Sequence, residues 1–220
     1  MAELIRSLAR RVFLSDPAQG INQVVEQISQ KRALQRWEKS GRQLPPPHIV
    51  KQRTVMEYAA RFSVHTFIET GTYLGSMVNA TKDTFARIIS IELDPALYER
   101  ARKRFSAFSH ITILQGDSSQ ILGQILASIQ EPCLFWLDAH HSGMLTARGS
   151  LESPIVQEMD HILNHPIVGH VVLIDDARIF VGQGGYPTLT ELQSMVASRR
   201  SDWIFQIKDD IIRAHNRRSE

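Results

Sequence analysis

From Thr66 onward, short apolar runs alternate with segments of helical character, and this alternation limits the fold more than any other feature of the chain. Strands that alternate with helices form βαβ units, in which each crossover helix returns the chain so that the next strand is parallel. The pattern therefore predicts an α/β fold with a parallel sheet. The five predicted strands are Thr66–Ile68, Ile88–Ile91, Ile111–Leu114, Cys133–Leu137 and Val171–Ile174.

The C-terminal part departs from this alternation. Two apolar runs, Trp203–Ile207 and Ile211–Ala214, are separated only by Lys208, Asp209 and Asp210. A parallel return needs a crossover of roughly a dozen residues, so these two strands must pair as an antiparallel hairpin. We expect seven strands, of which the first five are parallel.

The chain before Thr66 has a different character. It is predicted to be helical up to about Gly41, then extended through Pro45–Pro47, because consecutive prolines lack amide donors and favour an extended backbone. We expect an N-terminal helical extension with a Pro-rich linker over residues 1–48, and the main domain over residues 49–220. Amphipathic helices in the extension suggest a homodimer.

Cysteine content and charge exclude several classes of protein. The single cysteine, Cys133, rules out a disulfide framework within the chain and favours a cytoplasmic protein. Its place in an apolar run predicts a small buried hydrophobe. No stretch is long and apolar enough to span a bilayer. A net charge of +2 gives no indication of a nucleic-acid partner.

A glycine-bearing loop follows the first predicted strand, in the run Glu69–Ser76. Ligands of open parallel sheets bind at the carboxyl ends of the strands. Gly71 permits a tight turn and Gly75 a close approach of the backbone. The spacing G-x-x-x-G after an acid is neither the dinucleotide fingerprint nor a P-loop. An acid here would repel a pyrophosphate but suits an ammonium and a sulfonium, which favours S-adenosylmethionine (SAM) over NAD.

Polar residues also follow the next two strands. Glu92, beside Leu93, can accept hydrogen bonds from ribose hydroxyls, and Gly116–Ser118 can meet an adenine edge. Taken alone, Glu92 and Asp94 could cap one helix, and Asp117 the next. Their occurrence in order after three strands favours a cofactor site. The candidate cofactor-binding residues are Glu69, Thr70, Gly71, Thr72, Gly75, Ser76, Glu92, Leu93, Asp117, Ser118 and Asp138.

The run Phe67–Ser76, together with Glu92 and Gly116–Ser118, resembles the first three cofactor motifs of class I SAM-dependent methyltransferases. The C-terminal hairpin resembles the sixth and seventh strands of that family. The resemblance implies a Rossmann-like seven-stranded methyltransferase sheet with SAM as the cofactor. The first motif departs from the usual acid-x-Gly-x-Gly-x-Gly, since Tyr73 stands where a glycine is common.

Acidic and imidazole side chains follow the fourth and fifth strands, at Asp138, His140, His141, Asp175 and Asp176. Paired carboxylates repel one another unless a cation or a proton lies between them. Oxygen ligands suit Mg²⁺, and an added imidazole admits Mn²⁺, Fe²⁺ or Zn²⁺.

A simpler interpretation is also open. Asp175 and Asp176 could be one cap and one buried acid paired with Arg178, and the two histidines at 140 and 141 could merely line the crevice. The histidines farther along the chain are read as structural. They are His161, His165 and His170.

The acidic pattern resembles that of the metal-dependent sugar O-methyltransferases of the macrocin type. That resemblance implies Asp138 as the general base and His140, Asp175 and Asp176 as ligands of Mg²⁺ or Mn²⁺, with His140 replacing the second acid of the family's Asp-x-Asp. The catalytic candidates are Asp138, His140 and His141.

The hypothesis is SAM-dependent methylation of a hydroxyl on a small molecule such as a sugar or a catechol. The alternative is a non-catalytic SAM-binding regulatory or assembly module. Nucleic-acid methylation is disfavoured because Asp138–His141 stands where base methyltransferases carry a Pro-Pro-aromatic motif.

Overall fold

The computed structural model describes residues 17–138 and 153–217, with side chains from residue 28 onward. The chain divides into two compact units, Met1–Val50 and Lys51–Glu220. In the first unit, α2 (Pro17–Lys39) begins at a proline, which is well tolerated in the first turn of a helix. A turn after α2 is held by Trp37, whose indole N–H donates to the Gln43 carbonyl at 2.8 Å.

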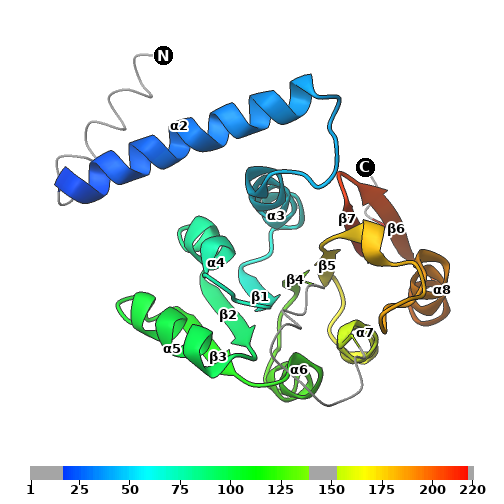
Figure 1. Cartoon of the computed structure of the whole chain (residues 1–220). Coiled ribbons are helices and arrows are strands. Elements are labelled where there is room, and N and C mark those ends of the chain that lie inside the picture. The colour runs from blue at the N-terminus through cyan, green and yellow to red at the C-terminus, as the bar shows by residue number, and fades with distance from the viewer. Residues whose placement is uncertain (1–16, 139–152, 218–220) are drawn as a thin grey trace. The chain divides into compact units, whose positions relative to one another are not determined.

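The second unit contains a seven-stranded sheet in the order β3-β2-β1-β4-β5-β7-β6 (Figure 1). The first five strands are parallel, and β7 is antiparallel to both β5 and β6, so the predicted sheet and hairpin are confirmed. The strands are β1 (Thr66–Thr70), β2 (Arg87–Glu92), β3 (Ile111–Gln115), β4 (Cys133–Leu137), β5 (Val171–Ile174), β6 (Trp203–Lys208) and β7 (Ile211–Asn216).

Helices cover both faces of this sheet. One face packs against α3, α4 and α5, and the other against α6, α7 and α8 (Figure 1). A strand buried on both faces has no polar side, which explains why the central strands are continuous apolar runs. The helices are α3 (His48–Phe62), α4 (Ser76–Thr81), α5 (Pro95–Arg104), α6 (Ser118–Leu126), α7 (Ile155–Asn164) and α8 (Leu189–Arg199), with a 3₁₀ turn, η1 (Ala177–Ile179).

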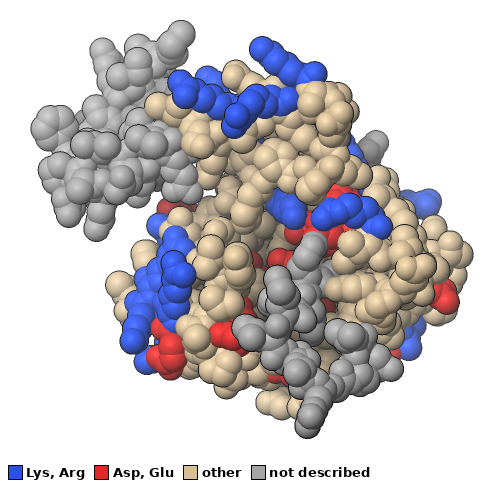
Figure 2. All heavy atoms as spheres, viewed as in Figure 1, with Lys and Arg blue, Asp and Glu red and all other residues tan. Residues whose placement is uncertain are grey.

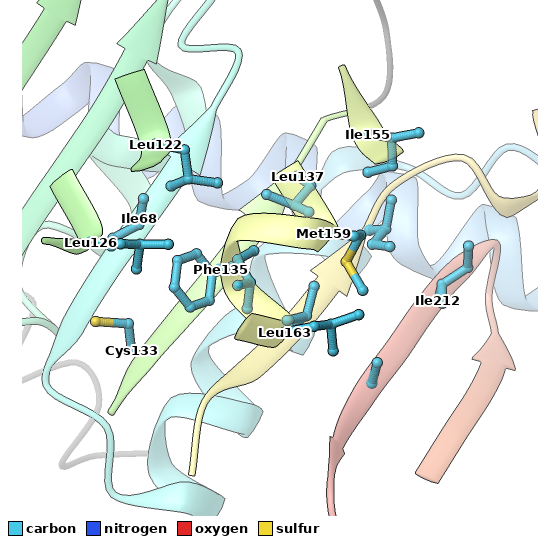
Figure 3. Packing of buried hydrophobic residues seen from close by; sticks show 14 of the residues in the cluster. Ile68, Leu122, Leu126, Cys133, Phe135, Leu137, Ile155, Met159, Leu163 and Ile212 are labelled. Atoms are coloured by element: carbon cyan, nitrogen blue, oxygen red, sulfur yellow. The ribbon is translucent and has the colours of Figure 1, made fainter. Parts of the chain in front are cut away.

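Neighbouring residues of each central strand enter different cores. Phe135 packs in the core beneath α6 and α7, beside Ile68, Leu122 and Met159 (Figure 3), whereas Trp136 packs in the core on the opposite face. Successive side chains of a strand point to opposite faces, so this division follows from the backbone.

Two predicted boundaries need correction or explanation. The sequence after the first glycine loop predicts a helix from about Ser76 to Phe85. Helix α4 ends at Thr81 instead, because Thr84 N–H bonds back to the Thr81 carbonyl in a tight turn and Phe85 stacks on Phe67 in the core. Helix α8 begins at Leu189 because Thr188 and Glu191 form a capping box.

The single cysteine and the histidines near it are structural. Cys133 is buried, as predicted, and burial raises the pKa of its thiol to about 12. Its N–H donates to His170 Nδ1 at 3.0 Å, and His170 in turn bonds His165 at 2.8 Å. Burial lowers the pKa of His170 to about 4. Cys133 begins β4 and His170 directly precedes β5, so this contact lies at the opposite end of β4 from Asp138.

Among residues 17–138 and 153–217, no helix has the length and apolar character needed to cross a membrane.

Candidate cofactor and acceptor site

Strand order reverses between β1 and β4, and the loops that follow these strands meet there. Thr70 pairs with Leu137, and Leu137 with Ile174, so β1, β4 and β5 end at the same level. The ladder continues one residue further, since Asp138 N–H donates to the Thr70 carbonyl at 3.2 Å and Asp175 N–H to the Leu137 carbonyl at 2.9 Å. The predicted cofactor loop and the predicted acidic residues therefore emerge at one edge.

The loop after β1 requires both of its glycines. A Cβ atom on Gly75 would lie 2.7 Å from Phe105 Cε2, and one on Gly71 would lie 3.2 Å from Asp138 Cβ. Both residues also have positive φ angles, 87° at Gly71 and 70° at Gly75. The N–H groups of Gly71 and Thr72 donate to the Ile91 carbonyl at 2.9 and 3.2 Å. The loop is thus fixed to β2 and closely approaches both α5 and Asp138.

Glu92 holds the same loop from the end of β2. Its buried carboxylate accepts from the N–H of Tyr73 at 2.7 Å and of Asp94 at 2.9 Å. Tyr73 needs such support, because it adopts a left-handed conformation (φ 48°) that side-chain-bearing residues disfavour. A carboxylate has about four acceptor positions, so Glu92 keeps capacity for further donors.

Asp94 and Asp117 both cap helices, as the simpler interpretation of these residues expected. Asp94 Oδ1 accepts from the N–H groups of Ala96 and Leu97 at 2.8 and 2.9 Å. Asp117 Oδ1 accepts from the N–H and hydroxyl of Ser119 at 2.9 and 2.7 Å. Capping does not exclude a role for Asp117 in binding, since both of these contacts use Oδ1.

Glu69 lies beneath the loop. It accepts a hydrogen bond of 2.5 Å from the Ser90 hydroxyl, which also lies 2.6 Å from the hydroxyl of Thr72. Burial raises the pKa of Glu69 well above its ordinary value, although the bond from Ser90 opposes this shift. Ser90 was not among the predicted site residues; its signal in the sequence is a hydroxyl within an otherwise apolar strand.

Glu158, on α7, is a second residue that the sequence analysis missed. It is only 2% exposed, and burial raises its pKa to about 7, while the nearby hydroxyls of Ser118 and Thr70 act to lower it. Despite this proximity, Glu158 Oε1 and Thr70 Oγ1 have no partner with hydrogen-bond geometry among the described residues. Glu158 therefore places an ionisable group beside the ends of β1 and β4.

The predicted acidic residues after β4 and β5 do converge. Oxygen atoms of Asp138, Asp175 and Asp176 lie within 4.8 Å of one another, and we call these three residues the acid cluster. Asp175 Oδ1 accepts from the N–H of Asp176 at 2.8 Å, and Asp176 adopts a left-handed conformation (φ 53°). His140 and His141 lie outside the described residues.

Two basic side chains compensate the acid cluster. Lys51 Nζ, from α3, lies 2.5 Å from Asp175 Oδ2 and 3.5 Å from Asp176 Oδ1. Arg178 Nη1 lies 2.6 Å from Asp176 Oδ1 and also pairs with the carboxylate of Asp210. The expected pairing of one acid with Arg178 is thus present, whereas Lys51 was not predicted.

The pKa values of Lys51 and Asp175 both rise. Burial lowers the pKa of Lys51, but attraction to Asp175, Asp176 and Asp138 raises it above its ordinary value. Burial raises the pKa of Asp175 to about 6, and repulsion from Asp176 and Asp138 acts in the same direction. The contact with Lys51 acts to lower this pKa but does not cancel the rise. The ammonium of Lys51 attracts the carboxylates of the acid cluster and offsets part of their mutual repulsion.

The acid cluster can be tested for its fit to a divalent cation. Three carboxylates are a suitable donor set for Mg²⁺ or Mn²⁺. The ammonium of Lys51, however, is already in contact with Asp175 Oδ2 and lies near Asp176 Oδ1. Mg²⁺ binds oxygen at about 2.0–2.1 Å, so an ion on Asp175 Oδ2 would compete with the ammonium for the same oxygen. With Lys51 in this position, Asp175 Oδ2 does not fit a bound metal.

No protein-family model matches the sequence, and no curated protein matches it significantly. Solved structures do match. One is the O-methyltransferase TomG from Streptomyces achromogenes, involved in tomaymycin synthesis and in complex with SAM, with a TM-score of 0.58 at 15% identity over 85% of this chain and 88% of TomG. The chain has the fold of class I SAM-dependent methyltransferases.

Two further structures with this fold differ in the atom that they methylate. An O-methyltransferase from Bacillus cereus, in complex with S-adenosylhomocysteine (SAH), has a TM-score of 0.58 at 11% identity over 86% of this chain and 90% of that chain. The N-methyltransferase NodS from Bradyrhizobium japonicum WM9 has a TM-score of 0.51 at 16% identity over 76% of this chain and 94% of that chain. The methyltransferase fold therefore does not by itself identify the acceptor.

Proposed function

We propose that the protein is a SAM-dependent methyltransferase that transfers the methyl group to a hydroxyl of a small molecule. The observation that carries this proposal is the close approach of Gly71 to Asp138, whose Cβ lies 3.2 Å from the position of a Cβ on Gly71. This approach puts a group able to accept a proton directly beside the loop on which SAM would bind.

The cofactor half of the site follows the predicted residues. In this proposal Glu92 accepts from the ribose hydroxyls with its remaining lone pairs, and Asp117 and Ser118 meet the adenine edge. Gly71, Thr72 and Gly75 form the loop around the methionine part, with Thr70 and Ser76 at its ends. Glu69 supports that loop from below through Ser90.

Methyl transfer then needs one displacement. The acceptor hydroxyl oxygen attacks the methyl carbon, the bond from carbon to sulfur breaks, and its electron pair stays on sulfur to give SAH. Asp138 takes the hydroxyl proton as general base, and holding the reactants in line supplies much of the rate. His140 and His141 are the alternative proton acceptors in the proposal.

A small-molecule acceptor is supported by two observations. The acidic pattern at positions 138, 175 and 176 resembles that of macrocin-type sugar O-methyltransferases. TomG, one of the structural matches, is involved in tomaymycin synthesis. Sugars and catechols are therefore the acceptors to screen first.

Calorimetric titration with SAH tests the cofactor assignment. We expect wild-type protein to bind SAH, and Glu92→Ala to bind at least about tenfold more weakly, because hydrogen bonds to a charged group each contribute about 1.5–3 kcal/mol. Glu99→Ala, an exposed acid on α5, is the matched control and should bind as wild type does. Failure of wild-type protein to bind SAH would overturn the proposal.

Turnover with isotopically labelled SAM tests catalysis. Asp138→Asn should abolish methylation of the best acceptor and leave SAH affinity within a few fold of wild type. If SAH binds but no sugar, catechol or other small hydroxyl compound is methylated, the non-catalytic module becomes the better description.

A further inference from the structure

Lys51 is the feature of the acceptor side that the proposed function has not yet used. It comes from α3, far from β4 and β5 in the sequence, and its ammonium lies between two carboxylates that are nearly inaccessible, with exposed fractions of 4% for Asp175 and 2% for Asp176. Acidic and basic atoms meet near the middle of the face seen in Figure 2.

The surrounding charges explain why a cation is needed at this point. Arg178 pairs with the carboxylate of Asp210 and with Asp176 Oδ1, the oxygen that also lies 3.5 Å from Lys51 Nζ. Asp175 has a different partner set: one oxygen accepts from the backbone of Asp176, and the other accepts from Lys51. Burial of adjacent carboxylates without a cation would be strongly unfavourable.

We propose that Lys51 is the resident cation of the acid cluster and takes the position that a divalent metal ion would hold against Asp175 and Asp176. This inference rests on the proposed function for its catalytic meaning. Lys51 then acts as a positioning residue: it holds Asp175 in place and offsets the negative charge beside Asp138 without an added metal.

The geometry sets the two cations in competition. An ion bound to Asp175 Oδ2 would stand about 2.1 Å from that oxygen, and Lys51 Nζ already lies 2.5 Å from the same atom. Binding of metal would require the lysine to leave, and the lysine would lose its ion pairs with Asp175 and Asp176. Removal of the ammonium should therefore create a metal site that the wild-type protein lacks.

Titration with Mn²⁺ tests this directly and needs neither SAM nor an acceptor. We expect Lys51→Met to bind Mn²⁺ at least about tenfold more tightly than wild type, as measured by calorimetry and by the paramagnetic resonance signal of free Mn²⁺. Lys51→Arg, which keeps the charge, should bind as weakly as wild type. Lys103→Met, an exposed lysine on α5, is the matched control.

Equal Mn²⁺ affinity in wild type and Lys51→Met would overturn the inference. If Lys51→Met does not fold, the wild-type protein still decides the question: micromolar Mn²⁺ binding that Asp175→Asn abolishes would show that the metal displaces the lysine. Failure to bind SAH would remove the proposed function and leave the Mn²⁺ comparison valid. With an acceptor identified, wild-type turnover should resist EDTA, and Mn²⁺ should restore part of the turnover lost in Lys51→Met.

Discussion

The two halves of the site are stabilised in different ways. At the ends of β1, β2 and β3, polar side chains are satisfied mainly by backbone N–H groups or by a hydroxyl, as at Glu92, Asp94 and Asp117. At the ends of β4 and β5, carboxylates are paired with basic side chains: Arg178 stands close to Asp176 in sequence, whereas Lys51 reaches Asp175 across 124 positions. The cofactor half is held mainly by hydrogen bonds from the backbone, and the acceptor half mainly by charge pairing.

The largest expected effect follows removal of a charge partner from the acceptor half. Arg178→Met leaves the buried carboxylates of Asp176 and Asp210 without their shared cation. Loss of one partner from a buried pair destabilises a protein by about 3–5 kcal/mol. Because the Arg178 side chain is 35% exposed and solvent screens part of the interaction, we expect the free energy of unfolding in urea to fall by about 3 kcal/mol.

The exposed ion pair between Arg102 and Glu99 on α5 is the control for this comparison. Arg102→Met should change the unfolding free energy by less than about 0.5 kcal/mol, because exposed pairs contribute little. A small loss in Arg178→Met as well would mean that the acceptor half does not depend on charge pairing.

The next effect concerns Glu158, a buried carboxyl between the two halves. Its pKa in the folded protein is raised to about 7 from an ordinary 4.5, so the folded state holds its proton more tightly than the unfolded state does. The resulting stabilisation is present below about pH 4.5 and is lost as the pH rises toward 7, by at most about 3 kcal/mol.

Glu158→Gln has no proton to lose at this position, so its stability should not fall for this reason as the pH rises from about 4.5 to 7. Relative to wild type, the variant should therefore become more stable as the pH rises through this window. Urea unfolding at pH 5, 6, 7 and 8 measures the difference. Parallel pH dependences in the two proteins would contradict the raised pKa. Glu191→Gln, at an exposed capping residue whose pKa is lowered by Thr188, is the control and should not reproduce the effect.

A smaller effect is expected when the backbone of the cofactor half is disturbed. Gly75→Ala places a Cβ 2.7 Å from Phe105 at a positive φ angle. The backbone strain should cost about 1 kcal/mol, and the steric clash with Phe105 should cost about as much. Together they should lower the free energy of unfolding by about 2 kcal/mol. SAH binding should weaken with it. Gly41→Ala has the same kind of φ angle with no atom within 4 Å, so it should show the strain alone.

The smallest effect is the loss of a single helix cap. Asp94→Ala removes the acceptor for two N–H groups at the start of α5 and should reduce stability in thermal unfolding by about 1 kcal/mol. Asp94→Asn keeps an acceptor oxygen and should be nearly neutral. An equal loss in both variants would attribute the effect to the charge and not to the cap.

This contrast also explains how much the sequence could predict. The sheet and its hairpin followed from the alternation of apolar runs, and both glycines and both caps have local signals. Lys51 has none: it is one basic residue among several on α3, and only the folded chain brings it to Asp175. Glu158 likewise reads as an ordinary acid in the first turn of a helix.

Several predictions from sequence remain predictions. These are the boundary between residues 48 and 49, the dimer through the N-terminal helices, and the roles of His140 and His141. The metal site of Asp175, Asp176 and His140 is also still a prediction, and the contacts of Lys51 with Asp175 and Asp176 compete with it.

The position of β7 has a consequence for the order of events during synthesis. This strand follows β6 in the chain but lies between β5 and β6, with hydrogen bonds to both. While a ribosome makes the protein, the edge of β5 stays open until β7 has emerged, although the cofactor strands β1 to β3 are available much earlier. Asp210, the partner of Arg178, stands directly before β7. The acceptor half is therefore completed among the last steps of folding.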